Sequence, residues 1–385
     1  MASETIPFRD GVGLVVRLEE VRGLADWPQA LALRSKDHRF YEIAEETLEP
    51  GFDHHYVVLK DEHDEVRGIQ PIFFVRQNLI EGVPALRALA DFIRRVFPRF
   101  LTMRILMVGN AGGAADLGVC RAGDERWVAQ ALQEVLPIYA HRAKASLIVF
   151  KDFPLKYRDS LGILTDGDFT RIPSMPMTRL ALRFGDFEEY LTSLSKATRK
   201  DLRRKFRKAA QRPPLQMEVR SDISPLLDEV YPLYLQVHER SPMKFEKLTK
   251  DYLRQLGQRM PERARFFIWR EDGRIVAFSV ALVHDGTIYD DYLGLDYSVA
   301  LDLHLYFLTF RDIITWAIEN GLTRYLSSPL NYEPKLHLGC DLLPLDLYVQ
   351  HTNRALNRLF RHILPLLEPT RHDPVLPRFP NAHEL

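Results

Sequence analysis

Two adjacent carboxylates stand in a stretch of sequence that otherwise has the composition of a buried β-strand. Asp290 and Asp291 lie within the predicted strand Thr287–Leu293, next to Tyr292. A carboxylate in an apolar strand is costly unless it is paired or solvated, and burial raises its pKa toward the range of a general base. Side-chain alternation predicts Asp290 and Tyr292 on one face and Asp291 on the other. Both are candidate general bases, with Asp291 preferred; the alternative is a structural carboxylate paired with an arginine.

A run of basic residues forms the second candidate site. Eight of the thirteen residues from 196 to 208 are Lys or Arg, against one Asp. Arginine suits bidentate phosphate contacts and lysine acts as a point charge, so the run predicts a helix face that binds phosphate. Lys196 and Arg199 are one turn apart, and Arg203 is next along that face. The alternative is a solvated helix face, which is the usual role of a charge run.

The elements around these residues follow one another in a regular series. Two strands joined by Glu271-Asp272-Gly273, a strong hairpin signal, precede the strand with the two carboxylates. A long helix is predicted over Leu301–Asn320, because its apolar residues recur at steps of three and four. Gly321 suits the C-terminal cap of that helix. The predicted strands Thr323–Ser327 and Leu342–Val349 complete the series.

This order resembles the C-terminal half of an acyltransferase domain of the GNAT superfamily, and more closely its two-lobed, FemAB-like branch. The basic run is similar to a Lys/Arg-rich helix at the entry to the second lobe of FemAB-like proteins. The segment Asn331-Tyr332-Glu333-Pro334-Lys335, followed by Leu338-Gly339, is similar to their Tyr/Lys-x-x-x-Gly signature before the last strand. The resemblance implies transfer of an acyl group from an activated donor to an amine.

The resemblance also implies roles for single residues. By position, Asn331 corresponds to an asparagine near CoA, Tyr332 to the acid that protonates the departing thiolate, and Lys335 to the basic residue of the signature. A tyrosine hydroxyl can supply such a proton, although a tyrosine in a loop before a short helix can instead pack or cap. The GNAT pyrophosphate loop corresponds to the residues from Gly294 onward. Its glycine-rich pattern is absent here, and only Gly294 and small residues such as Ser298 remain as candidate cofactor-binding positions.

The first half of the chain repeats the order of elements. Two strands, a long helix over Glu125–Ala143 and a further strand occur there, with a shorter helix predicted over Val83–Phe97. The predicted fold is therefore α/β (α+β), with tandem GNAT-like lobes that each have a mixed, mostly antiparallel sheet flanked by helices. We expect a degenerate N-terminal lobe over residues 1–173, where Pro173 and Pro176 interrupt any strand ladder. An acyltransferase lobe then covers residues 174–367, and a Pro-rich tail over 368–385 lies on the surface or is disordered.

Composition limits the classes of protein that fit. The 385 residues contain 52 Lys and Arg and 52 Asp and Glu, so a general nucleic-acid coat is excluded. Two cysteines are too few for a disulfide scaffold, which predicts a reducing compartment. There is no signal-peptide pattern, and no apolar run approaches the roughly 20 residues that span a bilayer. A cytoplasmic protein without a membrane span is expected. His54, His55 and His63 flank an acidic turn and are expected on a surface hairpin rather than as metal ligands.

The sequence as a whole predicts a GNAT-type N-acyltransferase. Its donor would be acyl-CoA or acetyl-CoA, bound as a co-substrate and not as a permanent cofactor, and its acceptor a small molecule or other amine. We expect the substrate in a cleft between the lobes that the basic helix walls. One alternative is a FemAB-like transferase with an aminoacyl-tRNA donor, which would make tRNA a partner. Another is a catalytically silent module that binds nucleic acid or an anionic surface through residues 196–208.

Overall fold

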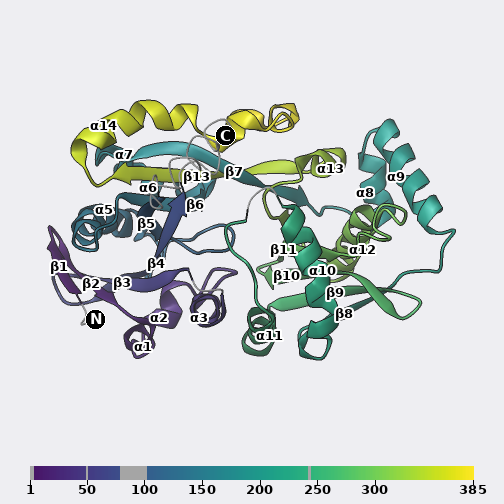
Figure 1. Ribbon diagram of the computed structural model, residues 1–385, viewed down its shortest axis with the longest axis horizontal. Coiled ribbons are helices and arrows are strands. Elements are labelled where there is room, and N and C mark those ends of the chain that lie inside the picture. Colours follow the sequence, from purple (N-terminus) through teal and green to yellow (C-terminus); the bar gives the residue numbers. More distant parts are fainter. Residues whose placement is uncertain (1–3, 49–50, 79–101, 242–243) are drawn as a thin grey trace, which may run out of the picture.

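The structure is a computed structural model and describes residues 4–48, 51–78, 102–241 and 244–385. Within these residues, thirteen strands form one mixed, mostly antiparallel sheet in the order β1-β2-β3-β4-β5-β6-β13-β7-β12-β11-β10-β9-β8 (Figure 1). The strands are β1 (Glu4–Phe8), β2 (Gly11–Val16), β3 (Asp53–Asp61), β4 (Val66–Asn78), β5 (Thr102–Val108), β6 (Leu147–Pro154), β7 (Thr170–Ala181), β8 (Gln216–Arg220), β9 (Ala264–Glu271), β10 (Arg274–His284), β11 (Thr287–Leu295), β12 (Arg324–Ser327) and β13 (Asp341–His351).

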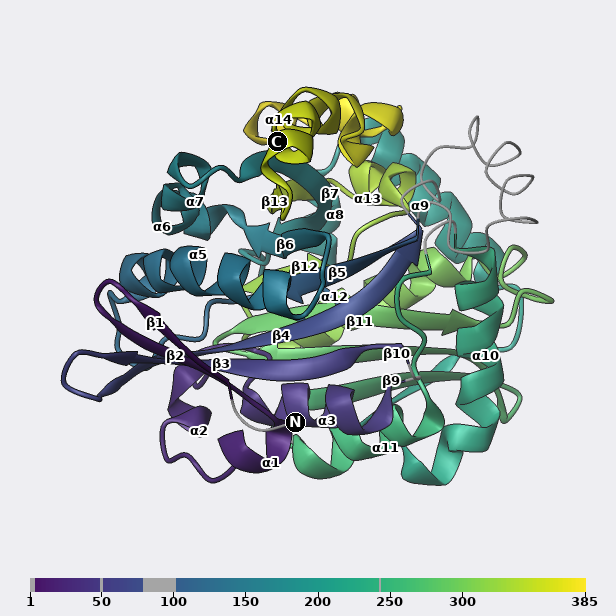
Figure 2. The ribbon, with the colours of Figure 1, turned by 60° about the vertical axis from the view of Figure 1, so that its left-hand side comes forward.

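Helices cover both faces of the sheet. Val128 and Leu132 of α5 pack on one face of the first strands, and Phe40 and Tyr41 of α3 pack on the other. Helices α3 and α11 lie side by side (Figure 2). The α-helices are α1 (Leu18–Val21), α2 (Trp27–Ala30), α3 (His38–Thr47), α5 (Glu125–Arg142), α6 (Arg158–Leu161), α7 (Ile163–Asp166), α8 (Phe187–Ser193), α9 (Lys196–Ala209), α10 (Leu227–Arg240), α11 (Lys250–Arg259), α12 (Leu305–Glu319), α13 (Tyr332–His337) and α14 (Arg354–Ile363).

The sheet contains the same arrangement twice. In the first lobe, which we define as β1–β6 with their helices, β5 and β6 are parallel and α5 connects them. In the second lobe, defined as β8–β12 with their helices, β11 and β12 are parallel and α12 connects them. Parallel neighbours need such a long crossover. This repetition confirms the predicted fold class, with two GNAT-like lobes of mixed sheet and flanking helices.

Two strands are shared between the lobes. β7 follows the first lobe in sequence but pairs with β12 of the second, and β13 follows the second lobe but pairs with β6 of the first. β7 and β13 also pair with each other and so join the two halves of the sheet. The predicted division at residues 173 and 174 therefore falls inside a strand that both lobes use.

The two prolines at that division do not end the strand, although the ladder is irregular beside one of them. β7 runs through Pro173 and Pro176. Ser174 pairs with Leu345 and Met177 with Leu343, so two residues of β7 oppose one of β13 there. This β-bulge provides a place for Pro176 at which no ladder hydrogen bond is required.

Two further expectations from the sequence are corrected. The C-terminal tail is ordered: Leu376 and Phe379 are buried, and the Asn381 side chain bonds to both the amide and the carbonyl of Leu342 at 2.9 Å. His55 is not a surface residue, since it is buried and its Nδ1 lies 3.2 Å from the Tyr139 hydroxyl. The helix predicted over Val83–Phe97 lies outside the described residues. None of the helices that the structure describes is long and apolar enough to cross a bilayer.

Candidate active site

The central strand β11 carries a bulge at its two carboxylates. Val280 of β10 pairs with Tyr292 and Ala281 pairs with Asp290, which leaves Asp291 as the extra residue. A bulge breaks strict alternation of side chains. As a result Asp291 and Tyr292 point to the same side of the sheet and Asp290 points to the other, so the alternation predicted from the sequence is wrong here.

Asp290 is held by hydroxyl groups from two neighbouring strands. Ser279 of β10 donates to its Oδ1, and the Tyr325 hydroxyl of β12 donates to its Oδ2 at 2.7 Å. Burial raises the pKa of Asp290 to about 6, against the effect of these two hydrogen bonds. At neutral pH the group is therefore an anion that accepts a proton more readily than an ordinary aspartate.

Lys335 lies on the same side, in the short helix α13. Its side chain is almost fully buried, and its ammonium donates to the carbonyl of Ser328. Burial lowers the pKa of Lys335 to about 8, although Cys340 and Asp290 act in the opposite direction. The two residues form an acid and a base whose pKa values lie on either side of neutrality.

Other side chains complete what we call the Asp290–Lys335 cluster. Burial raises the pKa of Tyr306, and a side-chain hydrogen bond from Asn331 opposes that rise. Burial likewise raises the pKa of the Cys340 thiol to about 12, which makes it a poor nucleophile. Before α13, Leu330 and Asn331 have φ of 72° and 53°. Left-handed backbone at two successive non-glycine residues is costly and is characteristic of functional sites. The cluster consists of Ser279, Asp290, Tyr306, Tyr325, Asn331, Lys335 and Cys340.

Tyr332, the acid implied by the resemblance, has its ring centroid 5.9 Å from Lys335 Nζ, but its hydroxyl is directed away from this cluster. Its hydroxyl is buried and donates to the carbonyl of Pro176 at 2.8 Å. Its ring packs edge-on against Phe379 of the tail, with centroids 6.2 Å apart. Burial raises the pKa of Tyr332, whose hydroxyl is engaged by a main-chain carbonyl. The tyrosine hydroxyl that bonds to Asp290 is instead that of Tyr325.

The position of the GNAT pyrophosphate loop is occupied by the protein's own groups. Both the amide and the hydroxyl of Ser298 donate to Asp296 Oδ1, at 2.9 and 2.6 Å. The amide of Tyr297 donates to Gln236. At Gly294, an added Cβ would lie 2.2 Å from the ring of Phe278 and 2.8 Å from the amide nitrogen of Tyr234. The contacts of Gly294 and Ser298 are thus internal, and a phosphate at this turn would have to displace Asp296.

Known proteins resemble the chain in one segment of sequence and in overall fold. Residues 196–332 match the family model of the acetyltransferase (GNAT) domain. The second lobe, together with α9, is therefore similar in sequence to a GNAT domain. No curated protein sequence matches the chain. The match covers the basic helix α9, the strand β11 with its two carboxylates, and the turn before α13. We call these residues, 196–332, the GNAT lobe.

The resemblance to solved structures extends over both lobes. The crystal structure of FemX shares 14% identity and a TM-score of 0.52, over 84% of this chain and 93% of that one. The C-terminal domain of a putative lysylphosphatidylglycerol synthetase from Agrobacterium fabrum shares 13% identity and a TM-score of 0.50, over 88% and 96%. A conserved protein of unknown function from Bacteroides thetaiotaomicron shares 13% identity and a TM-score of 0.50, over 89% of this chain and 98% of that one. At such identities the likeness concerns the fold alone, which the chain shares with FemX over both lobes.

The basic helix α9 of the GNAT lobe has two different faces. The predicted phosphate residues Lys196, Arg199 and Arg203 line a surface hollow of about 700 Å³ beside α8. Arg199 donates to the carbonyl of Thr192 at 2.9 Å, and Arg203 pairs with Glu188 at 2.7 Å. These contacts fix α9 against α8 (Figure 1).

The other face of α9 lies toward the start of α12. Lys205 Nζ sits 4.1 Å from the centroid of the Phe307 ring, and Asp201 lies 3.1 Å from His337 Nε2. Burial lowers the pKa of His304, and the charges of Lys208 and Lys205 lower it further. This face, rather than the predicted one, brings basic residues to the first turn of α12.

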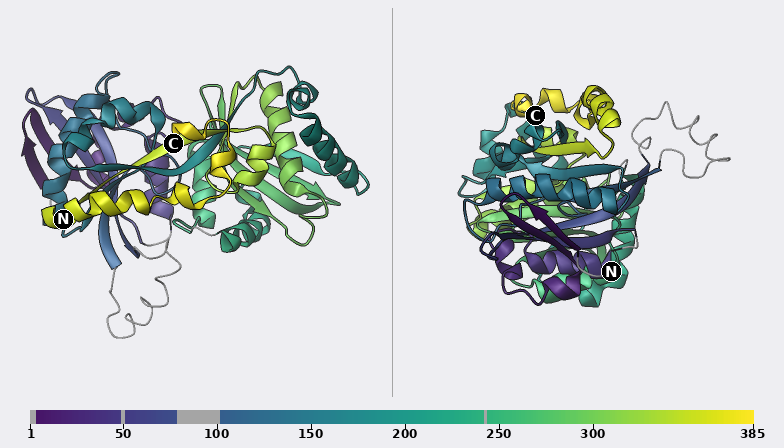
Figure 3. Two further views of the ribbon diagram at one scale, coloured as in Figure 1. Left: turned by 90° about the horizontal axis from the view of Figure 1, so that it is seen from above. Right: turned by 90° about the vertical axis from the view of Figure 1, so that its left-hand side faces the viewer.

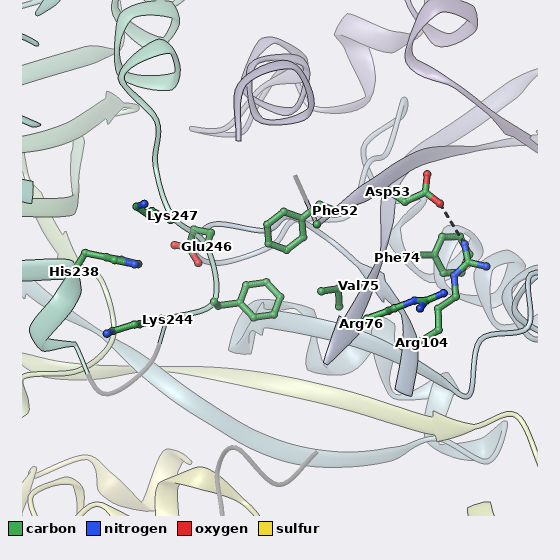
Figure 4. Close-up of a pocket in the computed structure, with 12 residues that line it drawn as sticks. Phe52, Asp53, Phe74, Val75, Arg76, Arg104, His238, Lys244, Glu246 and Lys247 are labelled. Atoms are coloured by element: carbon green, nitrogen blue, oxygen red, sulfur yellow. Dashed lines mark hydrogen bonds and ion pairs between the residues drawn. The ribbon is translucent and has the colours of Figure 1, made fainter. Parts of the chain in front are cut away.

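A pocket with a volume of about 770 Å³ lies between the lobes (Figure 4). Phe52, Phe74 and Phe245 form its apolar wall, and its lining residues include cations from both lobes. The cations are Arg76, Arg104, Lys244 and Lys247. No residue of α9 lines this pocket among those the structure describes, so the expectation that the basic helix walls the cleft is wrong.

The pocket reaches the central strand through one carboxylate. Glu246, at its floor, accepts a hydrogen bond of 3.0 Å from the Tyr292 hydroxyl. Beside Tyr292, Asp291 lies 3.5 Å from the ammonium of Lys36, which the first lobe supplies. Burial raises the pKa of Asp291, and Lys36 opposes the rise. Asp291, the preferred base from the sequence, is therefore paired with a lysine rather than the arginine of the alternative.

Proposed function

We propose that the chain is a GNAT-type N-acyltransferase that moves an acyl group from acyl-CoA, or a similar activated donor, to an amine. The observation that carries the proposal is the Asp290–Lys335 cluster, whose Asp290 lies in the segment that matches the GNAT domain. A buried carboxylate with a pKa of about 6 beside a buried ammonium with a pKa of about 8 is a base and an acid that act near neutrality.

The chemistry needs one proton acceptor and one proton donor. The amine nitrogen attacks the thioester carbonyl carbon, and a C–N bond forms as the C–S bond breaks. Asp290 accepts the proton that the attacking amine loses, while Tyr325 and Ser279 keep its carboxylate in place. Lys335 gives a proton to the departing thiolate, and proton exchange between the two groups then restores the starting state. In this proposal Lys335, and not Tyr332, is the acid that protonates the departing thiolate.

The pocket between the lobes supports a particular class of acceptor. Its aromatic wall suits an apolar body, and Arg76, Arg104 and Lys244 suit a carboxylate or phosphate on the acceptor. Through Glu246 and Tyr292 the pocket adjoins the side of β11 on which Asp291 lies, opposite to that of Asp290. Since β11 and β12 pair only as far as Asp290 and Ser327, we infer that an amine with an anionic group binds in this pocket and reaches Asp290 where the two strands part.

A FemAB-like donor, an aminoacyl-tRNA, is the second candidate. The turn at Asp296 and Ser298 supports this candidate, because the Asp296 carboxylate accepts the hydrogen bonds that a CoA pyrophosphate would usually accept there. The likeness in fold to FemX agrees with this candidate but does not choose the donor. The two free cysteines, Cys120 and Cys340, agree with the predicted cytoplasmic location.

The test is an acyl-transfer assay that follows free thiol release from acetyl-CoA and longer acyl-CoA donors with a panel of anionic amines. Asp290→Asn and Lys335→Met should each lower kcat by about a hundredfold or more, the usual effect of a positioned acid or base. Tyr332→Phe is the matched control, since it removes a buried hydroxyl outside the cluster and should retain turnover. Wild-type rates in Asp290→Asn would reject the mechanism. Turnover that occurs only with charged tRNA, and that ribonuclease abolishes, would select the second donor.

A further inference from the structure

The helix α14 runs along the outer surface of the molecule (Figure 3). Its inner side is fixed by Asn357, which accepts from the amide of His351 and donates to the carbonyl of Asp168, both at 2.8 Å. Phe360 and Leu364 pack against the apolar cluster under the helix. These contacts hold the helix in one orientation and leave its remaining sides to solvent.

One flank of this helix and the 3-10 turn that follows it expose four leucines. Leu356, Leu359, Leu366 and Leu367 are 43%, 52%, 64% and 48% exposed. Positions 356, 359 and 363 of α14 follow the spacing of one helical stripe, and Leu366 and Leu367 belong to the turn after the helix. Seven large apolar side chains of the described residues are exposed, and four of them are these leucines. The apolar sector of α14 is thus wider than the part that packs, and such a concentration indicates a binding surface.

The neighbouring flank is basic. Arg354, Arg358 and His362 are exposed and follow one another at intervals of four. Arg361 pairs with Asp168, but no ion pair among the described residues involves Arg354 or Arg358. The row of leucines therefore borders a row of available positive charge, in a chain whose net charge is zero.

We propose that α14 is a docking helix for an anionic lipid surface. Leucines on such a helix enter the boundary between headgroups and acyl chains, and long basic side chains reach back to the phosphates. The alternative occupant, a second copy of this chain, is disfavoured by charge. In a symmetric dimer the same patch meets itself, so Arg354 and Arg358 would face like charges. An anionic bilayer complements both rows at once.

This surface is separate from the pocket and the Asp290–Lys335 cluster. Its role is to hold the chain at a bilayer, reversibly, since a single short amphipathic helix gives only modest affinity. The contribution of the arginines is electrostatic, so binding should weaken as salt rises.

The experiment is flotation of the full chain with two kinds of vesicle, pure phosphatidylcholine and phosphatidylcholine mixed with phosphatidylglycerol. The wild type should float with the mixed vesicles and stay in solution with the neutral ones. Leu359→Gln combined with Leu366→Gln should weaken binding at least about tenfold. Arg354→Gln and Arg358→Gln should each weaken it about fivefold.

The controls are matched in chemistry and exposure. Leu33→Gln and Leu301→Gln change leucines that are 78% and 79% exposed elsewhere, and Arg9→Gln changes an exposed arginine elsewhere. All three should float as the wild type does. The proposal is overturned if the wild type ignores the anionic vesicles, or if the leucine variants and the controls bind alike. A dimer in light scattering that Leu359→Gln dissociates, without lipid binding, would assign the patch to self-association.

Discussion

At Asp290 and Lys335, burial acts on two groups of opposite charge and moves their pKa values toward each other. The carboxyl rises to about 6 and the ammonium falls to about 8. Each group also limits the shift of the other, because two opposite charges near each other favour both charged forms. Between the two values both groups are charged, which is the state the proposed reaction requires.

Acyl transfer should therefore show a bell-shaped pH dependence of kcat/KM, with limbs near pH 6 and pH 8. Below the first limb Asp290 is protonated and cannot accept the amine proton. Above the second limb Lys335 has lost the proton it would donate. Because the two groups interact, the apparent pKa values of the two limbs describe the pair and not each residue alone. In Lys335→Arg the alkaline limb should disappear, because a guanidinium stays protonated. An unchanged alkaline limb in that variant would assign it to another group.

The sequence identified part of this cluster. Asp290 was found because a carboxylate in an apolar strand requires an explanation, and Lys335 because of a family signature. The contact of Tyr325 with Asp290 could not be predicted, because it depends on the parallel pairing of β11 and β12. The surroundings of Tyr332 could not be predicted, because its partners Pro176 of β7 and Phe379 of the tail are distant in sequence.

At the scale of elements, α9 shows what a charge run can and cannot predict. Its residue types indicate phosphate binding, but the side that meets a ligand depends on how the helix packs. Arg199 and Arg203 bond to α8. Lys205 and Lys208 lie instead toward His304 at the start of α12, where the helix dipole adds to their positive charge. Element order was predictable from periodicity, whereas this orientation depends on tertiary contacts.

Lys208→Gln should weaken binding of CoA about tenfold, the usual effect of losing one charge-assisted contact. Lys196→Gln is the matched control. Neither lysine takes part in an ion pair among the described residues, and the two lie on different faces of α9. Isothermal titration with CoA measures both. If only Lys196→Gln weakened the binding of CoA, the phosphate site would lie on the face of α9 that was predicted from the sequence.

At the scale of the whole molecule, the lobes are joined by exchanged strands and not by a linker. β13 is anchored beside the first lobe by Asp346, which is buried and receives hydrogen bonds of 2.7 Å from Arg158 and Arg171. The same strand carries the tail that packs on Tyr332 of the GNAT lobe. The sequence predicted two lobes but not this exchange, because strand pairing over such separations leaves no local pattern.

The two lobes should consequently unfold together. Phe379→Ala removes a buried ring from the tail and should cost about 3 kcal/mol. Because β13 pairs with β6 as well as β7, that loss should reach the first lobe too. Hydrogen exchange in urea should show peptides of β3 and β10 losing protection at one shared urea concentration, which the variant lowers equally for both. Leu33→Ala, at an exposed site, should leave that concentration unchanged. If only the GNAT lobe shifted, the lobes would be independent folding units despite their shared sheet.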